Sequence, residues 1–74
     1  MKEKVVKIFI NTEYLQLQQL LKKADLISSG GEAKIFLAEN EVLVDGTPDN
    51  RRGRKLYPGS IIKIKDQIYE IVSR

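Results

Sequence analysis

Residues 28–60 read SSGGEAKIFLAENEVLVDGTPDNRRGRKLYPGS, and this stretch decides the fold. It predicts, in order, a helix with a small polar start, a short β-branched strand, an Asp-Gly turn and a polar segment rich in cations. This order holds a cluster of positive charge beside the start of a helix, where backbone N–H groups are free. Both features can bind a phosphate backbone without catalysing a reaction. The stretch therefore indicates a small nucleic-acid-binding module, and we expect the nucleic acid to be RNA. The cations are Arg51, Arg52, Arg54 and Lys55.

The predicted helix in this stretch begins at Ser29. Ser29 and Glu32 have the spacing of a capping box, in which each side chain accepts a hydrogen bond from a free backbone N–H. Gly30 and Gly31 follow in the first turn, although glycine costs about 1 kcal/mol relative to alanine in a helix interior. Either an RNA backbone approaches closely there, or the turn packs tightly against a first helix. The inner face should consist of Ala33, Phe36 and Leu37.

The chain before this stretch predicts one strand and one helix. Residues 5–10 are β-branched or aromatic except for one lysine, which favours a strand. The next segment is ambiguous, since a helix could begin between Thr12 and Leu17, or the strand could continue through Leu15. Further on, one apolar stripe at helical spacing predicts the face that the first helix buries, namely Leu17, Leu20, Leu21 and Ala24.

The chain after residue 40 predicts three strands separated by turns. Asn40 suits the left-handed residue that ends a helix. The strands are expected at residues 42–44, 61–64 and 68–72, with turns at Asp45-Gly46, Pro58-Gly59 and Asp66-Gln67, and with an irregular segment over 47–55. The β-α-α-β-β-β order predicts an α+β fold in which two adjacent helices pack over a small, mainly antiparallel sheet.

The composition limits both the size and the chemistry of the protein. Seventy-four residues predict a single domain over residues 1–74. Cysteine and histidine are both absent, which excludes disulfides and the usual soft metal ligands, so no metal or cofactor is expected. The same absence leaves Asp, Glu, Lys and Tyr for acid–base work, and no carboxylate pair or nucleotide loop is recognisable, so we do not expect an enzyme. No signal-like or membrane-spanning run occurs, which predicts a cytoplasmic protein.

The charges are distributed unevenly along the chain. The net charge is only +3, but residues 38–50 carry four acidic residues and no basic ones, whereas residues 51–74 carry seven basic and two acidic residues. Such a distribution predicts a polarised surface if the two segments lie apart in space. Ordinary solvated charge is the alternative.

The segments SSGGEAKIFLAENEVLVDG and RRGRKLYPG together resemble the S4 RNA-binding domain, and more narrowly the small stand-alone bacterial S4-domain proteins of the YaaA/YbcJ type. In that family a serine–glycine turn opens the second helix, an E-A-K or Q-A-K triplet follows, and a V-x-V-x-G strand precedes an R-[RK]-x-x-K loop. The resemblance implies the S4 fold, with a helical hairpin on a bent sheet. It also implies binding to structured RNA, commonly ribosomal or transfer RNA, through the helix pair and the basic loop.

Two positions depart from the broad S4 pattern. Many S4 domains have an arginine where this chain has Gln16, and many have Ser-Arg where this chain has Ser29-Gly30. Two usual phosphate contacts are therefore missing, and the loop from Arg51 to Lys55 is expected to compensate for them.

The cations of this loop are the leading candidates for RNA binding. Arginine offers a planar fork that matches phosphate oxygens in pairs. Gly53 would let the loop bend so that the cations face one partner. In the alternative interpretation the loop is flexible and solvated, and its cations pair with Asp49 or Glu41.

A second group of candidates lies at the start of the second helix. Lys34 should leave the core on an exposed flank, and together with Ser29, Gly30 and Gly31 it could hold a phosphate there. Alternatively, Ser29 is occupied as a cap and Lys34 only faces water.

The remaining candidates are two lysines and one tyrosine. Lys22 and Lys23, on the outer side of the first helix, would add unspecific attraction to RNA or simply form a solvated face. Tyr57 adjoins the basic loop and could stack on a base, whereas Tyr14 and Tyr69 are expected in the core or at its rim. The few aromatic residues favour the reading of shape and phosphates.

The leading hypothesis is a non-catalytic, monomeric RNA-binding protein that docks on ribosomal RNA or on a ribosome-assembly particle. The alternative is a protein-interaction adaptor, in which the acidic segment over residues 39–49 docks a ribosomal or RNA-modifying protein. Neither hypothesis involves a membrane.

Overall fold

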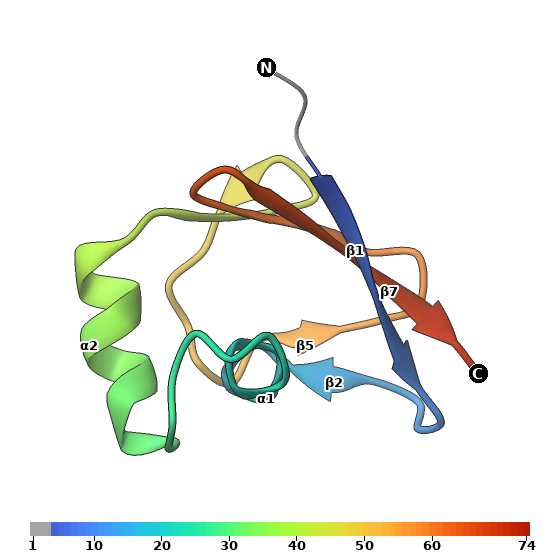
Figure 1. The fold of residues 1–74 in the computed structure, drawn as a ribbon, viewed down its shortest axis with the longest axis horizontal. Coiled ribbons are helices and arrows are strands. Elements are labelled where there is room, and N and C mark those ends of the chain that lie inside the picture. The colour runs from blue at the N-terminus through green and yellow to red at the C-terminus, as the bar shows by residue number, and fades with distance from the viewer. Residues whose placement is uncertain (1–3) are drawn as a thin grey trace.

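The computed structural model describes residues 4–74, which form a five-stranded sheet, a separate two-stranded ribbon and two helices (Figure 1). Neither of the helices within this range is long and apolar enough to cross a membrane. The elements are, in chain order, β1 (Lys4–Ile10), β2 (Leu15–Gln16), α1 (Leu17–Lys23), α2 (Gly31–Glu39), β3 (Val42–Val44), β4 (Thr47–Pro48), β5 (Lys55–Leu56), β6 (Ile61–Ile64) and β7 (Gln67–Ser73).

The five-stranded sheet has the strand order β1-β7-β6-β3-β4, and β2 pairs with β5 in the ribbon. β1 and β7 are parallel, whereas every other neighbouring pair is antiparallel. The predicted α+β class with a mainly antiparallel sheet is confirmed. The parallel pair joins segments far apart in the sequence, since Lys4 is aligned with Gln67 and Ile10 with Ser73.

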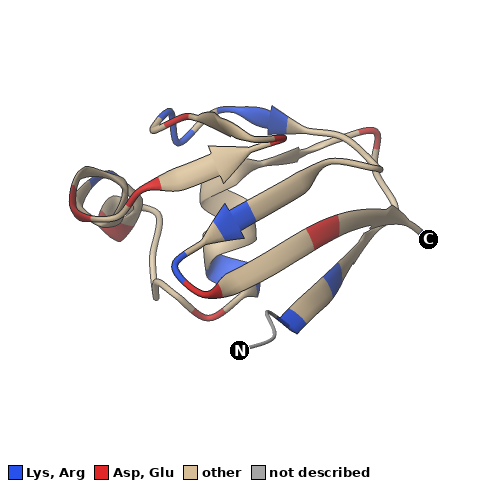
Figure 2. Cartoon of the chain, turned by 90° about the horizontal axis from the view of Figure 1, so that it is seen from above, with Lys and Arg blue, Asp and Glu red and all other residues tan. Residues whose placement is uncertain are grey.

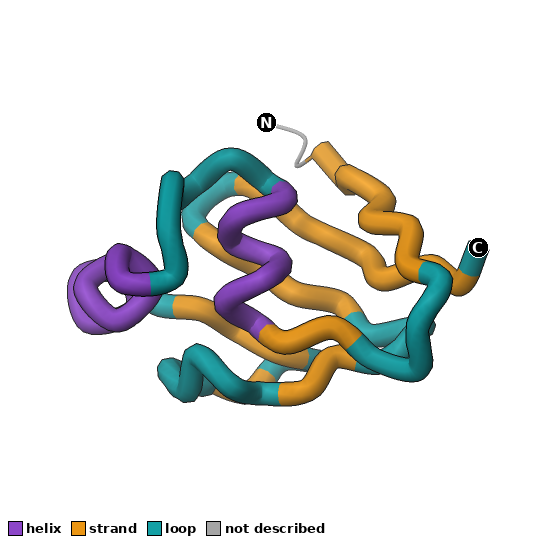
Figure 3. Tube along the Cα trace, turned by 90° about the horizontal axis from the view of Figure 1, so that it is seen from below, coloured by secondary structure: helices purple, strands orange, loops and turns teal. Residues whose placement is uncertain are grey.

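The sheet has one covered face and one open face. Figure 3 shows α1 lying across the sheet, and Figure 2, from the other side, shows a face with no helix in front of it. Because successive strand residues point to opposite faces, Ile62 and Ile64 are buried while Ile61 is exposed. The core consists of Ile8, Ile10, Leu15, Leu17, Leu20, Leu21, Ile27, Ala33, Leu37, Leu56, Val42, Val44, Ile62, Ile64, Tyr69 and Ile71.

The segment between β1 and α1 contains both of the elements that the sequence left open. β2 continues the chain in extended form, and α1 begins directly after it at Leu17. The predicted apolar stripe of α1 is confirmed, because its three leucines are fully buried and Ala24 packs half-buried against the same core. In Figure 1 α1 is seen end-on while α2 runs lengthwise, so the two helices cross instead of lying side by side.

The predicted capping box at the start of α2 was wrong. Gly30, not Ser29, is the N-cap residue, and it makes no side-chain cap bond. The backbone carbonyl of Ser29 accepts the N–H of Glu32 at 3.1 Å, which leaves Ser29 one position outside the helix start. The carboxylate of Glu32 therefore reaches further back and accepts the backbone N–H of Ser28.

The predicted left-handed end of α2 was also wrong. Asn40 has an extended backbone, with φ −130° and ψ 136°. Its side-chain amide and its backbone N–H both donate to the carbonyl of Phe36, at 3.0 and 2.9 Å, so the helix end is satisfied without a left-handed residue. The left-handed residue that follows a helix is Asp25, with φ 61°, after α1.

The turns that carry glycine lie where the sequence predicts them. Asp45 and Gly46 have φ of 52° and 86° between β3 and β4, and Gly59, in the Pro-Gly turn, has φ of 98°. The β6–β7 turn lies at Lys65–Asp66, just before its predicted place, and Lys65 takes the left-handed conformation with φ 56°. The segment predicted as irregular supplies one short strand at each end, β4 and β5, and a loop between them.

Candidate nucleic-acid interface

The loop between β4 and β5, residues 49–54, is called the basic loop below, and it runs between the two helices (Figure 1). Its backbone is fixed to the start of α1. The carbonyl of Arg54 accepts the N–H of Leu17 at 2.8 Å, and the carbonyl of Arg52 accepts the N–H of Gln18 at 2.9 Å. These N–H groups have no partner inside the helix, so the loop satisfies them and gains a defined position in return.

Asp49 aligns two arginines of the basic loop. Its Oδ1 accepts hydrogen bonds from the backbone N–H of Arg51 at 2.9 Å and from Arg51 Nε at 3.1 Å. Its Oδ2 accepts from Arg51 Nη2 at 2.9 Å and from Arg54 Nη1 at 2.7 Å. The Asp49 side chain is only 7% exposed, whereas that of Arg51 is 69% exposed. The hydrogen bonds from the Arg51 side chain are the main reason that the pKa of the Asp49 carboxyl lies well below its ordinary value. Burial opposes them, and the Arg51 backbone N–H and the Arg54 side chain lower this pKa further.

The predicted pairing of loop cations with Asp49 is therefore found. This one carboxylate faces two arginines, so the segment from Arg51 to Lys55 keeps a net positive charge. No carboxylate within residues 4–74 pairs with Arg52, and Glu41 pairs with no cation in that range. The charge of Asp49 is also no longer available to the acidic segment that the adaptor hypothesis requires.

A hollow of about 380 Å³ separates the basic loop from α2, and it joins two predicted candidates. Lys34 comes from the exposed side of α2 and Arg52 from the loop, and both line this hollow. Its other walls are Leu37, Ala38 and Asn50. Two cations from separate elements thus face one space that is open to solvent.

Gln18 links the start of α2 to the basic loop. Its backbone N–H is bonded to Arg52, and a Cβ added at Gly30 would lie 3.8 Å from its Oε1. A Cβ added at Gly31 would lie 3.9 Å from Ser29 Oγ. Both distances are ordinary contacts, so alanine would fit at either glycine and tight packing does not explain them. The hydroxyl of Ser29 has no hydrogen-bond partner within residues 4–74.

Gly53 lies in the turn of the loop, where the N–H of Arg54 donates to the carbonyl of Arg51 at 3.1 Å, but the turn does not require a glycine at this position. Its φ is not in the left-handed region, and an added Cβ would meet no atom within 4 Å. The loop takes its course from its bonds to α1 and Asp49, so a residue with a side chain would be accommodated at this position.

Tyr57 lies beside the basic loop in space as well as in sequence. Together with Arg51, Gly53, Arg54 and Lys55 it lines a second hollow, of about 430 Å³. Tyr69 is buried in the core as expected, and its burial raises the pKa of its hydroxyl.

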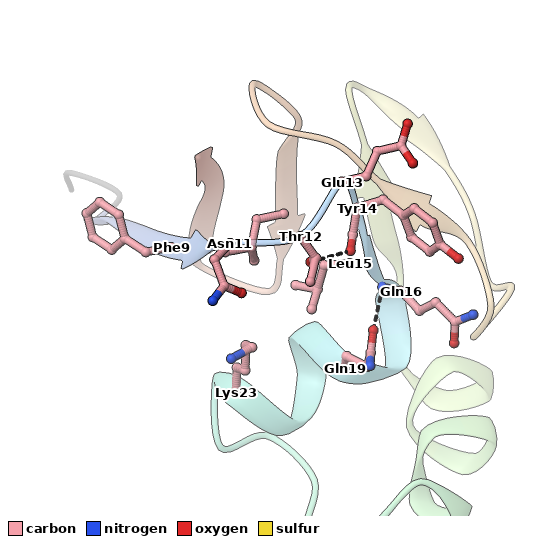
Figure 4. Close-up of a pocket in the computed structure, with 10 residues that line it drawn as sticks. Phe9, Asn11, Thr12, Glu13, Tyr14, Leu15, Gln16, Gln19 and Lys23 are labelled. Carbon is pink, nitrogen blue, oxygen red and sulfur yellow. Dashed lines mark hydrogen bonds between the residues drawn. The ribbon is translucent and has the colours of Figure 1, made fainter. Parts of the chain in front are cut away.

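Lys22 and Lys23 lie apart from these groups, in the last turn of α1 and at the opposite end from the basic loop. Lys23 lines a hollow of about 550 Å³ formed by the end of β1, the β1–β2 connection and α1 (Figure 4). Cations in the last turn of a helix interact favourably with its carbonyl end, which is a sufficient structural reason for both residues. The structure does not bring them to the loop.

A family model described as "S4 domain" matches residues 8–72. The chain belongs to the S4 domain family. A protein of Bacillus subtilis (strain 168) named "Probable ribosome maturation protein RlbA" is 60% identical over 58 residues, which cover 78% of this chain and 82% of that protein. A protein of Escherichia coli (strain K12) named "Putative RNA-binding protein YbcJ" is 32% identical over 60 residues, which cover 81% of this chain and 86% of that protein. The resemblance to small bacterial S4-domain proteins is thereby confirmed.

In this S4 domain, the glutamine that stands in place of an expected arginine has a structural role. The backbone N–H of Gln16 donates to Gln19 Oε1 at 2.9 Å, and Gln16 Oε1 accepts from Gln18 Nε2 at 2.8 Å (the former drawn in Figure 4). Gln16 therefore organises the start of α1, where the basic loop is bound, instead of presenting a charge.

Two residues of this S4 domain were missed as parts of the site. Gln18 was not among the predicted site residues, and Tyr14 was expected in the core or at its rim. Nothing local in the sequence marks either residue, because Gln18 acquires its position from the β4–β5 loop and Tyr14 lies beside Tyr57, far along the chain. Only knowledge of the β2–β5 pairing would have found them.

Proposed function

We propose that this S4 domain is a non-catalytic RNA-binding protein that docks on structured RNA of the ribosome or of an assembling ribosomal particle. The interface consists of the basic loop with Lys55, the start of α2 and Lys34. The observation that carries the proposal is the convergence of Lys34 and Arg52 on one hollow between α2 and the basic loop. The names of the two bacterial relatives support an RNA-related and ribosome-related role.

The mechanism is electrostatic docking by cations that are already in position. Asp49 holds the guanidinium groups of Arg51 and Arg54, and the backbone of the loop is bound to α1, so little conformational freedom is lost when phosphates bind. Each phosphate that a cation neutralises releases counterions, which provides affinity but little sequence information. The shape of the folded RNA then decides where the protein binds.

The two glycines at the start of α2 support the same interface. Since alanine would fit at Gly30 and Gly31 within the protein, the missing side chains leave room outside it. An RNA backbone could approach the helix start there and accept hydrogen bonds from free N–H groups.

The test compares binding of a fluorescent ribosomal RNA hairpin and a duplex DNA of equal length by anisotropy, at several salt concentrations. The site variant combines Lys34→Gln and Arg52→Gln. The control variant combines Lys4→Gln and Lys7→Gln on β1, which removes the same charge far from the loop. If wild type neutralises about five phosphates, the log–log slope of affinity against salt is about −3.5 to −4.5, and the site variant reduces its magnitude by about 1.4–1.8.

The wild type should bind RNA more tightly than DNA, and the control variant should retain most of this binding. Equal losses in both variants would show unspecific attraction to net charge and would overturn the proposed interface. No salt-dependent RNA binding by the wild type would overturn the function itself. Size-exclusion chromatography of the free protein tests the accompanying expectation of a monomer.

A further inference from the structure

Tyr14 and Tyr57 form a pair of rings at one end of the β2–β5 ribbon. Leu15 is aligned with Leu56 in this antiparallel ribbon, so the residue before β2 and the residue after β5 are the next to face each other. The ring centroids are 6.0 Å apart with a tilt of 55° between the planes. This distance is in the range of favourable aromatic pairs.

The backbone of both tyrosines is held by hydrogen bonds from outside the pair. The hydroxyl of Thr12 donates to the carbonyl of Tyr14 at 2.9 Å, a bond drawn in Figure 4. On the other side, the carbonyl of Tyr57 accepts the N–H of Ser60 at 2.9 Å, and the N–H of Tyr57 donates to Ser60 Oγ at 3.3 Å. The backbone that carries the two rings is therefore fixed, and the paired rings form a platform that is present without a ligand.

The platform is exposed on the side where the loop cations lie. Tyr14 is half-buried and lies under Lys55, whose Nζ is 4.8 Å from the ring centroid. Tyr57 is 47% exposed, and it forms one wall of the 430 Å³ hollow that Arg51 and Lys55 also line. An exposed aromatic ring and two cations thus face the same space.

These groups match the two halves of a nucleotide. A base can stack on the face of an aromatic ring, and the adjoining phosphate can bind the ammonium and guanidinium groups. A base inside a duplex is stacked between its neighbours and cannot enter such a hollow, whereas a bulged, looped or terminal base can be splayed out. The hollow offers no arrangement that reads the edge of a particular base, so it would accept any of them.

We propose that this S4 domain captures one unpaired nucleotide of its RNA, with the base stacked on Tyr57 and the phosphate held by Lys55 and Arg51. Tyr14 is a positioning residue that supports Tyr57 from behind. The proposal rests on the RNA-binding function proposed above and specifies the feature of the RNA that the protein selects.

The test uses two RNA hairpins of equal length, one fully paired and one with a single unpaired residue in the stem. 2-Aminopurine at the unpaired position reports stacking by a change in fluorescence, and anisotropy measures affinity. The proteins are wild type, Tyr57→Ala, Tyr57→Phe and Tyr14→Ala, each checked by thermal unfolding. Tyr57→Phe keeps the ring face and is the matched control.

The wild type should prefer the bulged hairpin, and Tyr57→Ala should weaken binding of that hairpin by about 5- to 150-fold. The same variant should bind the fully paired hairpin as wild type does, and Tyr57→Phe should keep the preference and the fluorescence change. Tyr14→Ala should reduce the preference in part.

Equal binding of both hairpins by wild type, with no effect of Tyr57→Ala, would overturn the capture of a nucleotide while leaving the RNA-binding function intact. An equal loss on both hairpins in Tyr57→Ala would likewise overturn it, since the ring would then act on the fold or on paired RNA. Absence of binding to either hairpin by wild type would overturn both proposals.

Discussion

The role of Asp49 in the structure differs from the role that its place in the sequence suggests. In the sequence it belongs to an acidic segment, but in the fold its carboxylate is nearly buried and accepts four hydrogen bonds from the two arginines that follow it. Sequence reasoning named this pairing as an alternative to RNA binding. The geometry makes the two compatible, because a carboxylate that orients arginines leaves their outer edges exposed.

Replacing Asp49 by asparagine should destabilise the protein in a pH-dependent way. At pH 7 we expect a loss of about 1–3 kcal/mol in the free energy of unfolding, because charge-assisted hydrogen bonds are lost. The carboxyl has a lowered pKa in the folded state, so its contribution is present above its unfolded pKa of about 4 and fades as the pH falls below that value. Urea unfolding of wild type and Asp49→Asn at pH 7 and pH 2.5 should therefore show a smaller difference at pH 2.5.

A control for this experiment is Glu39→Gln, since Glu39 is an exposed carboxylate with no hydrogen bond or ion pair within residues 4–74. Its effect should be small at both pH values. A difference between wild type and Asp49→Asn that does not change with pH would contradict the assignment of the effect to the charge.

At the scale of elements, hydrophobic periodicity and turn residues correctly predicted those helices, strands and turns that depend mainly on their own local sequence. The stripe of α1 is buried, the strand over Val42–Val44 and the Asp45-Gly46 turn are in place, and β6 matches its alternating pattern. β5 was not predicted as a strand and β2 was only one of two alternatives, because two residues have no periodicity and each depends on a partner far along the chain. The start of α2 was misplaced because the pattern from Ser29 to Glu32 does not specify which backbone N–H the glutamate reaches.

Gly46 and Gly53 allow the same substitution, glycine to alanine, to be compared at two turns with different backbone conformations. Gly46 has φ 86°, where a Cβ is strained, so Gly46→Ala should cost about 1–2 kcal/mol of stability. Gly53→Ala should be neutral or stabilise by up to about 1 kcal/mol, because its backbone is compatible with alanine and the unfolded chain loses freedom. Thermal unfolding of both variants checks this, and a large loss in Gly53→Ala would show that the loop needs glycine after all.

The start of α2 allows stability and binding to be separated. The variant Gly31→Ala should keep or raise the stability, because Gly31 is the first residue of α2, alanine has the higher helix propensity and its side chain fits there. If RNA approaches this turn, the same variant should bind the RNA hairpin at least several-fold more weakly. Unchanged RNA affinity would remove the helix start from the interface.

At the scale of the whole molecule, the sheet has a face packed on α1 and a face open to solvent, and this arrangement can be tested on one strand. Ile71 of β7 is 1% exposed toward the core, whereas Ile68 points to the open face and is half-exposed. Ile71→Ala should cost about 2–5 kcal/mol, and Ile68→Ala clearly less. Equal losses in urea unfolding would contradict the two-faced sheet.

The sequence indicated this class of fold but not the way in which the sheet closes. Hydrophobic pattern and turn residues specify neighbours joined by short turns, such as β6 with β7, and the family resemblance supplied the rest of the architecture. Nothing in residues 4–10 marks their partner as the last strand, because a parallel pair has no turn between its strands to record it.

The parallel pairing of β1 with β7 has a consequence for folding during synthesis on the ribosome. β1 is synthesised before the other described strands, yet its partner in the sheet, β7, is synthesised after them. At about 5–20 residues per second, β1 waits on the order of 3–12 s with Ile8, Phe9 and Ile10 unpaired. Until β7 has been translated, β1 therefore remains an unpaired hydrophobic strand, which is the state in which nascent chains attract chaperones or one another.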